Sequence, residues 1–179
     1  MSRGPFIRTF CGRHVHVFDP RPDEIELLDI AHALSNQCRY NGHTSRFYSV
    51  AEHAVYVSWS CGQYALEGLL HDAAEAYIGD LVSPIKRDPR ASFFKEELEL
   101  PMERVIAQRF RLVYPWPAII HDIDRCMIPA ERAQLFPDFG SRDAGYEDCA
   151  DLKLPEIGLE PAKARALFLH TFDRLMGER

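Results

Sequence analysis

The stretch that decides the fold class is residues 66–80, LEGLLHDAAEAYIGD. Its apolar residues recur at the three- and four-residue intervals of one helix face: Leu66, Leu69, Leu70, Ala73, Ala74 and Tyr77. Gly79 stands where a C-terminal cap glycine belongs, so the pattern predicts one helix over residues 63–78. His71 and Asp72 lie inside this apolar segment, and a carboxylate buried there needs a charged partner or an ion.

Outward from this stretch, the same periodicity predicts helices through most of the chain. We expect them from Asp29 to about 37, from Ser49 to about 60, over 93–110, over 118–136 and from Pro161 to about 176. Ser49 and Glu52 have the spacing of a capping box, and Pro129 is where we expect the 118–136 helix to kink.

Segments 6–19 and 137–160 lack this periodicity, and Pro84 and Pro89 mark a loop over 84–89. Alternation around Gly12 predicts a small β-hairpin in 6–19, and the glycines, prolines and acids of 137–160 predict a long acidic loop. The expected fold class is therefore all-α, a helical bundle with a small N-terminal β-hairpin, in a single domain spanning 1–179.

The composition is that of one soluble globular domain: 179 residues, 46% apolar and 27% charged. A net charge of −6 argues against a nucleic-acid polymer as partner. The chain has no apolar run of about 18 residues and no signal-peptide core, so we expect no membrane partner and a cytoplasmic location. The five cysteines are widely spaced without a CxxC motif and predict free thiols.

Histidines and acids on the expected helices predict a metal site. His71, Asp72 and Glu75 lie within one helical turn, and Asp80 follows the end of that helix. Mixed imidazole and carboxylate ligands suit divalent Mn, Fe, Co, Ni or Zn. His53 is the second ingredient, although a lone histidine on an apolar helix is more often a core residue.

A third ingredient comes from His121-Asp122-Ile123-Asp124. Asp122 and Asp124 cannot both point the same way on a helix, and the broad apolar stripe around them leaves open which one faces inward.

Two segments resemble a known family. Residues 46–57 (RFYSVAEHAVYV) and 68–86 (GLLHDAAEAYIGDLVSPIK) are similar to the HD-domain phosphohydrolase superfamily. The similarity is to its small bacterial and phage hydrolases, the 5′-deoxynucleotidases and phage dATP triphosphohydrolases. It covers most of residues 25–136, and the long HDAAEAYIGD motif with AEH before it is far more specific than the HD pair alone.

The resemblance implies a site within residues 39–132. The metal ligands would be His53, His71, Asp72 and Asp124, the last preferred over Asp122 because Glu131-Arg132 follows it seven residues later. Catalytic acids would be Glu75 and Asp80. Arg39 and Lys86 would bind phosphate, with Tyr40 against the base or sugar, although ordinary surface charge is the alternative reading of these basic residues.

The expected function is a metal-dependent phosphohydrolase that removes phosphate from 5′-(deoxy)nucleotides with a metal-activated water. The cofactor would be a divalent ion: Co, Mn, Zn, Ni, Fe or Mg. One alternative is a deoxynucleoside triphosphate triphosphohydrolase, which releases triphosphate, and another is a non-enzymatic binding protein with a degenerate HD fold. A metallopeptidase is disfavoured because HExxH is absent. We also expect a homo-oligomer with an interface near Trp116.

Overall fold

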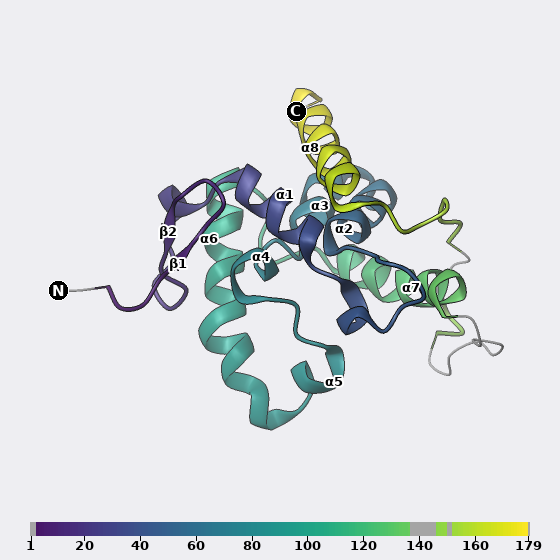
Figure 1. Cartoon of the computed structure of the whole chain (residues 1–179), viewed down its shortest axis with the longest axis horizontal. Helices are drawn as coiled ribbons and strands as arrows, with labels where there is room; N and C mark the ends of the chain where they lie inside the picture. The colour runs from purple at the N-terminus through teal and green to yellow at the C-terminus, as the bar shows by residue number, and fades with distance from the viewer. Residues whose placement is uncertain (1–2, 137–145, 150–151, 179) are drawn as a thin grey trace.

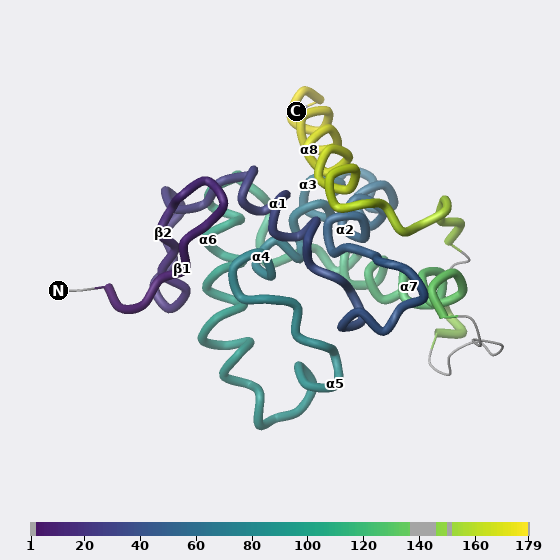
Figure 2. The backbone as a smooth tube through the Cα atoms, in the orientation of Figure 1, coloured from purple at the N-terminus to yellow at the C-terminus, as the bar shows by residue number. Residues whose placement is uncertain are grey.

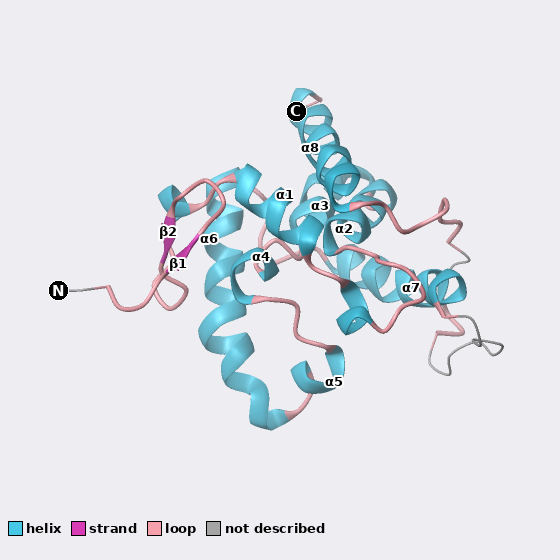
Figure 3. Ribbon diagram, in the orientation of Figure 1, coloured by secondary structure: helices cyan, strands magenta, loops and turns pink. Residues whose placement is uncertain are grey.

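Helices make up most of the computed structural model, which describes residues 3–136, 146–149 and 152–178 (Figures 1 and 3). The strands are β1 (Ile7–Arg8) and β2 (His14–Val15), and the α-helices are α1 (Leu27–Asn36), α2 (Val50–Ser60), α3 (Ala65–Leu70), α4 (Glu75–Ile78), α5 (Ser83–Lys86), α6 (Leu100–Phe110), α7 (Ala118–Leu135) and α8 (Pro161–Gly177). Shorter 3₁₀ turns and a π-helical segment, Phe94–Glu99, connect them. The all-α class is confirmed.

Helix α2 is the centre of the bundle. It packs against α1, α3, α7 and α8, and every residue from Val50 to Ser58 is buried. Ser49 caps it as predicted, because the Ser49 hydroxyl accepts a hydrogen bond from the Glu52 amide at 3.1 Å. The central position explains why α2 is apolar on all sides and why its polar residues need partners inside the protein.

The small N-terminal hairpin is also confirmed. Ile7 pairs with Val15 and Arg8 with His14 in antiparallel register. Gly12 allows the turn between them because its φ of 81° lies in the left-handed region. The hairpin lies beside α6 at the edge of the bundle, at the N-terminal end of the trace (Figure 2).

The helix predicted over 63–78 is not continuous. Helix α3 ends at Leu70 and α4 begins at Glu75. Between them the backbone tightens into hydrogen bonds three residues apart, such as Ala73 to Leu70 at 3.1 Å and Glu75 to Asp72 at 3.0 Å. Apolar periodicity does not separate this tighter winding from an α-helix, since both place the same residues against the core. Gly79 ends α4 as predicted, with a φ of 84°.

The polar residues near the helix starts also differ from the prediction. Helix α1 begins at Leu27, two residues before the predicted start at Asp29. The Asp29 carboxylate is buried and accepts the Cys11 amide at 2.6 Å. The Glu52 side chain does not complete a capping box either. It turns toward the segment before α8, where the amides of Gly158 and Leu159 donate to it at 3.0 and 2.8 Å.

Two further predicted segments differ from the structure. The predicted helix over 93–110 divides into the π-helical segment and α6, while a short helix, α5, occupies part of the predicted 84–89 loop. Helix α7 continues through Pro129. Part of the predicted acidic loop, 137–145 and 150–151, lies outside the described residues; the described remainder up to Glu160 contains neither helix nor strand.

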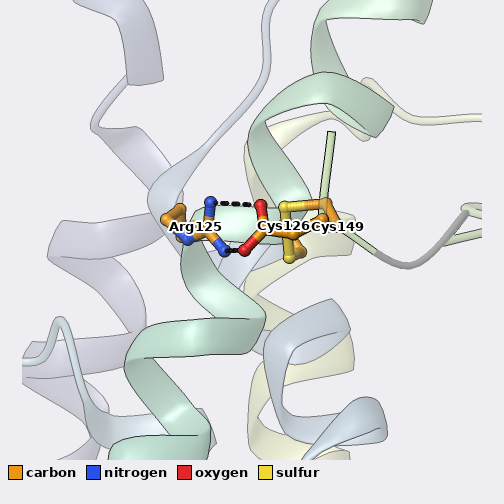
Figure 4. The surroundings of a disulfide bond; sticks show 4 residues. Arg125, Cys126 and Cys149 are labelled. Atoms are coloured by element: carbon orange, nitrogen blue, oxygen red, sulfur yellow. Dashed lines mark hydrogen bonds and ion pairs between the residues drawn. A yellow bond between two sulfur atoms is a disulfide. The ribbon is translucent and has the colours of Figure 1, made fainter. Parts of the chain in front are cut away.

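The prediction of five free thiols is wrong for two of them. Cys126 on α7 forms a disulfide with Cys149, whose Cα lies 5.2 Å away, while Cys11, Cys38 and Cys61 are free. Figure 4 shows the disulfide beside Arg125, which pairs with Asp148 at 2.7 Å. The pairing is non-local: residue 149 returns to α7 after 23 positions, and Cys spacing does not indicate that contact.

Trp116 is buried, with 8% of its surface exposed, and its ring packs edge-on against Tyr114. Val113 and Ile119 near it are exposed apolar residues, so the interface expected near Trp116 stays a prediction. Within the described residues, no helix combines the length and the apolar character that crossing a membrane requires.

Candidate metal centre

Three separate helical segments bring His53, His71 and Asp124 together. One ligand atom from each lies within 4.8 Å of the others. His53 comes from α2, Asp124 from α7, and His71 from the tight turn after α3. The Nε2 atom of His53 lies 3.0 Å from Asp124 Oδ1. The structure also decides between the two aspartates, because Asp122 is exposed and outside this cluster.

Asp72 adds a second carboxylate to the same place. Its Oδ2 lies 3.2 Å from His71 Nε2 and 3.7 Å from His53 Nε2. The four residues predicted as metal ligands thus converge, with both histidines buried and both aspartates partly exposed. A cluster of two imidazoles and two carboxylates from three segments has the donor types of a divalent-metal site.

The orientation of the histidines fits a metal better than a hydrogen-bond network. His53 Nδ1 lies 2.6 Å from Glu131 Oε1, and His71 Nδ1 lies 2.8 Å from the carbonyl of Gly68. Because an ionised carboxylate and a carbonyl only accept, both Nδ1 atoms donate, and each neutral ring has its lone pair on Nε2. Both Nε2 atoms are buried and have no hydrogen-bond partner among the described residues. This is the arrangement of metal-ligating histidines with an outer partner.

The electrostatics show that the cluster attracts positive charge. Burial alone would lower the pKa of His71, but the adjacent Asp72 carboxylate raises it to about 9. Burial would raise the pKa of Asp72, yet His71, His53 and Arg39 hold it far below its ordinary value. Lone pairs of the neutral rings and carboxylates facing one another repel, and either protons or a cation would relieve this repulsion.

A cavity of about 790 Å³ opens beside the cluster. Seven of the nine predicted site residues line it: Arg39, Tyr40, Asp72, Glu75, Asp80, Lys86 and Asp124. The other two, His53 and His71, are buried behind this wall. The cavity is therefore lined by acids close to the cluster and also by basic side chains, a combination suited to a metal together with an anion.

Buried Glu75 and partly exposed Lys86 form an ion pair on the cavity wall. Lys86 Nζ lies 2.9 Å from Glu75 Oε1 and 2.8 Å from Glu99 Oε1. The second Glu75 oxygen, Oε2, is buried without a hydrogen-bond partner. Burial and the Asp72 charge raise the pKa of Glu75 well above its ordinary value. Burial also raises the pKa of Asp80. Both groups therefore hold a proton more readily than a solvated acid.

Arg39 and Tyr40 face an acid that the sequence did not single out as part of the site. Arg39 Nη2 lies 3.3 Å from Glu131 Oε2, and the Tyr40 hydroxyl donates to the same oxygen at 2.6 Å. Arg39 also approaches Asp72, with Nη1 at 3.7 Å from Oδ2. Sequence reasoning used Glu131 only as a spacing marker for Asp124, although both positions lie on one face of a helix, two turns apart.

Arg87 is a second residue that the sequence reasoning missed. It follows Lys86, lines the cavity, and within the described parts of the chain its guanidinium has no hydrogen-bond or ion-pair partner. Arg39 and Lys86, by contrast, are already paired with acids. No sequence signal separates Arg87 from its basic neighbours, because the distinction depends on which acids the folded chain places beside each one.

Comparison with known proteins finds relatives whose names state no activity. No family model matches the chain. It is 37% identical over 172 residues to the Escherichia coli K12 protein named "Uncharacterized protein YfdR", covering 95% of each chain. It is 36% identical over 118 residues to "Uncharacterized protein RCAP_rcc00048" of Rhodobacter capsulatus, covering 60% of this chain and 58% of the relative.

Proposed function

The chain belongs to the same family as the Escherichia coli protein YfdR, and we propose that it is a metal-dependent phosphohydrolase acting on nucleotides. The proposed substrates are 5′-(deoxy)nucleotides, from which it would release inorganic phosphate. We keep the cytoplasm as the proposed compartment, because a nucleotide pool is found there.

One observation carries the proposal. The unpartnered Nε2 atoms of His53 and His71 meet the carboxylates of Asp72 and Asp124 at the wall of a cavity that also carries basic side chains. Acids alone would repel a phosphate, and basic residues alone would not need the buried imidazoles. Cation and anion sites side by side suit a phosphate ester bound next to a metal.

The four residues His53, His71, Asp72 and Asp124 would hold the ion. A divalent metal bound there would supply Lewis-acid polarisation of a phosphoryl oxygen. The mixed nitrogen and oxygen donors favour Mn, Fe, Co, Ni or Zn, while Mg prefers oxygen alone. The metal panel in a test therefore includes all six ions.

Side chains of the protein would bind the phosphate, take up the proton and orient the water. Arg87, whose guanidinium has no partner among the described residues, would bind the phosphate directly, and Arg39, which lines the same cavity, would offer a second guanidinium. Glu75 would take a proton from an attacking water through Oε2, because Lys86 holds the other oxygen of this carboxylate. Asp80 lines the same wall and would orient that water.

A second candidate, the deoxynucleoside triphosphate triphosphohydrolase, is favoured by one feature of the cavity. Arg87 and Arg132 line it together with Arg39, and three guanidinium groups exceed what a single phosphate requires. A triphosphate chain would use this extra positive lining.

A substrate panel distinguishes these functions. Purified protein is incubated with each metal and with all nucleoside and deoxynucleoside mono- and triphosphates, and the products are separated by ion-exchange chromatography. Release of phosphate from monophosphates supports the main proposal, and release of triphosphate supports the second. Metal binding without turnover would support the non-enzymatic HD protein. Absence of both turnover and bound metal would overturn the metal-dependent proposals.

A further inference from the structure

Glu131 connects the two halves of the proposed site. It is fully buried on α7, and each oxygen of its carboxylate serves a different group of partners. Oε1 accepts from His53 Nδ1 at 2.6 Å and from the Tyr48 hydroxyl at 2.9 Å. Oε2 accepts from the Tyr40 hydroxyl at 2.6 Å and from Arg39 Nη2 at 3.3 Å.

We propose that Glu131 is a positioning residue that couples the proposed metal ligand His53 to the substrate-facing residues Arg39 and Tyr40. The inference rests on the proposed metal site. A carboxylate is planar, so the angle that satisfies His53 at one oxygen fixes where Tyr40 and Arg39 must lie at the other. The hydrogen bond also keeps the proton of His53 on Nδ1 and the lone pair on Nε2.

The backbone of residues 40 and 41 supports this role. Tyr40 has a φ of 55° and Asn41 a φ of 54°, in the left-handed region that residues other than glycine seldom adopt. Tyr40 is held there by its hydroxyl bond to Glu131 and by the edge of its ring against Phe136. Strained backbone at a cavity wall persists where surrounding contacts over-determine it, and the Glu131 bond is one such contact.

A neighbouring acid shows that burial alone does not give this role. Glu52 precedes His53 on α2 and is also fully buried. Its carboxylate accepts from Gly158 and Leu159 amides and from the Tyr56 hydroxyl. None of these partners lines the cavity. Glu52 therefore anchors the segment before α8, and Glu52→Gln is a matched control for Glu131→Gln.

Metal affinity tests the proposal without relying on turnover. Isothermal titration of the metal-free proteins with Mn²⁺ is carried out for wild type, E131Q, E52Q and Y40F, each checked by circular dichroism. We expect E131Q to bind Mn²⁺ about 10- to 100-fold more weakly, as loss of an outer partner of a metal-bound histidine does. E52Q should stay within about threefold of wild type, since its partners lie outside the site.

Y40F is the decisive variant if E131Q does not fold. It removes one donor from Glu131 on the substrate side and touches none of the proposed ligands. Coupling predicts that Y40F weakens Mn²⁺ binding about 3- to 10-fold, the loss of one hydrogen bond to a charged acceptor. Wild-type Mn²⁺ affinity in Y40F, or in folded E131Q, would overturn the coupling. Wild-type protein that binds Mn²⁺ but hydrolyses no nucleotide would instead remove the proposed function and leave the coupling.

Discussion

Two adjacent residues of α2, Glu52 and His53, make their side-chain contacts in different parts of the molecule. The Glu52 carboxylate accepts three donors, two amides and a tyrosine hydroxyl, so folding has satisfied it. Near the proposed metal site, three buried atoms have no hydrogen-bond partner among the described residues: His53 Nε2, His71 Nε2 and Glu75 Oε2. Because buried polar atoms without partners are costly, a group of them around one cavity indicates that another species completes the site.

The largest effect should follow from removing that species. Dialysis against a chelator is expected to abolish nucleotide hydrolysis, because the four converging donors then have no cation to oppose their mutual repulsion. Adding back Mn²⁺ or Co²⁺ should restore the activity, measured as phosphate release. Full activity in a sample that elemental analysis shows to be metal-free would contradict the proposal that a cation completes the cluster beside the cavity.

The second-largest effect should follow from replacing one of the proposed metal ligands. Asp124→Ala is expected to lower kcat/KM by at least about 100-fold, which exceeds the usual loss from an outer partner of a metal site. Asp122→Ala, the same change two residues away on an exposed position of α7, is the control and should stay within about twofold. Comparable losses in both variants would mean that the cluster is not the site.

A smaller effect is expected at Arg87, a cavity-lining cation that has no side-chain partner among the described residues. Arg87→Ala should raise KM about 10-fold, because one charge-assisted hydrogen bond to phosphate is lost. Arg90→Ala is the control, since Arg90 is exposed and paired with Asp88 at 2.7 Å. Equal KM values in steady-state kinetics for both variants would show that phosphate does not use Arg87.

Replacing Glu52, whose carboxylate is hydrogen-bonded to partners outside the cavity, should alter the stability of the protein rather than its activity. Glu52→Gln places an amide donor where three donors already point, and should lower the free energy of unfolding by about 1–3 kcal/mol. Urea denaturation measures this, with kcat determined on the same sample. A loss of kcat without a loss of stability would contradict the structural role assigned to Glu52.

The smallest effect concerns Glu103, a largely buried acid that Tyr114 contacts at 3.1 Å. Burial and the neighbouring Glu99 charge raise its pKa from 4.5 to about 7. The folded state then binds the proton more tightly than the unfolded state, so stability falls as pH rises from about 4.5 to about 7. Thermal melts at pH 5 and pH 8 should show Glu103→Gln gaining on wild type at the higher pH; a constant difference would contradict the shifted pKa.

Much of the fold was predictable because apolar periodicity records which helix faces are buried. Ser49, Gly12 and Gly79 were predicted correctly, since a cap and two positive-φ turns depend on local chemistry. The single helix over 63–78 was wrong, because α and tighter windings have similar apolar patterns. The roles of the nine predicted site residues stay predictions, while their convergence on one cavity is a property of the folded chain.

The sequence by itself determined the helical class, the hairpin and a set of histidines and acids able to meet. Periodicity left Asp124 and Asp122 open and the resemblance favoured Asp124, but only the tertiary structure brought Asp124 beside the histidines, paired Cys126 with Cys149, and placed Glu131 behind His53. The physical reason is the range of the interactions. Periodicity and caps act over a few residues, whereas hydrogen bonds to Glu131 join positions as far as 92 residues apart, and such contacts exist only once the helices have packed.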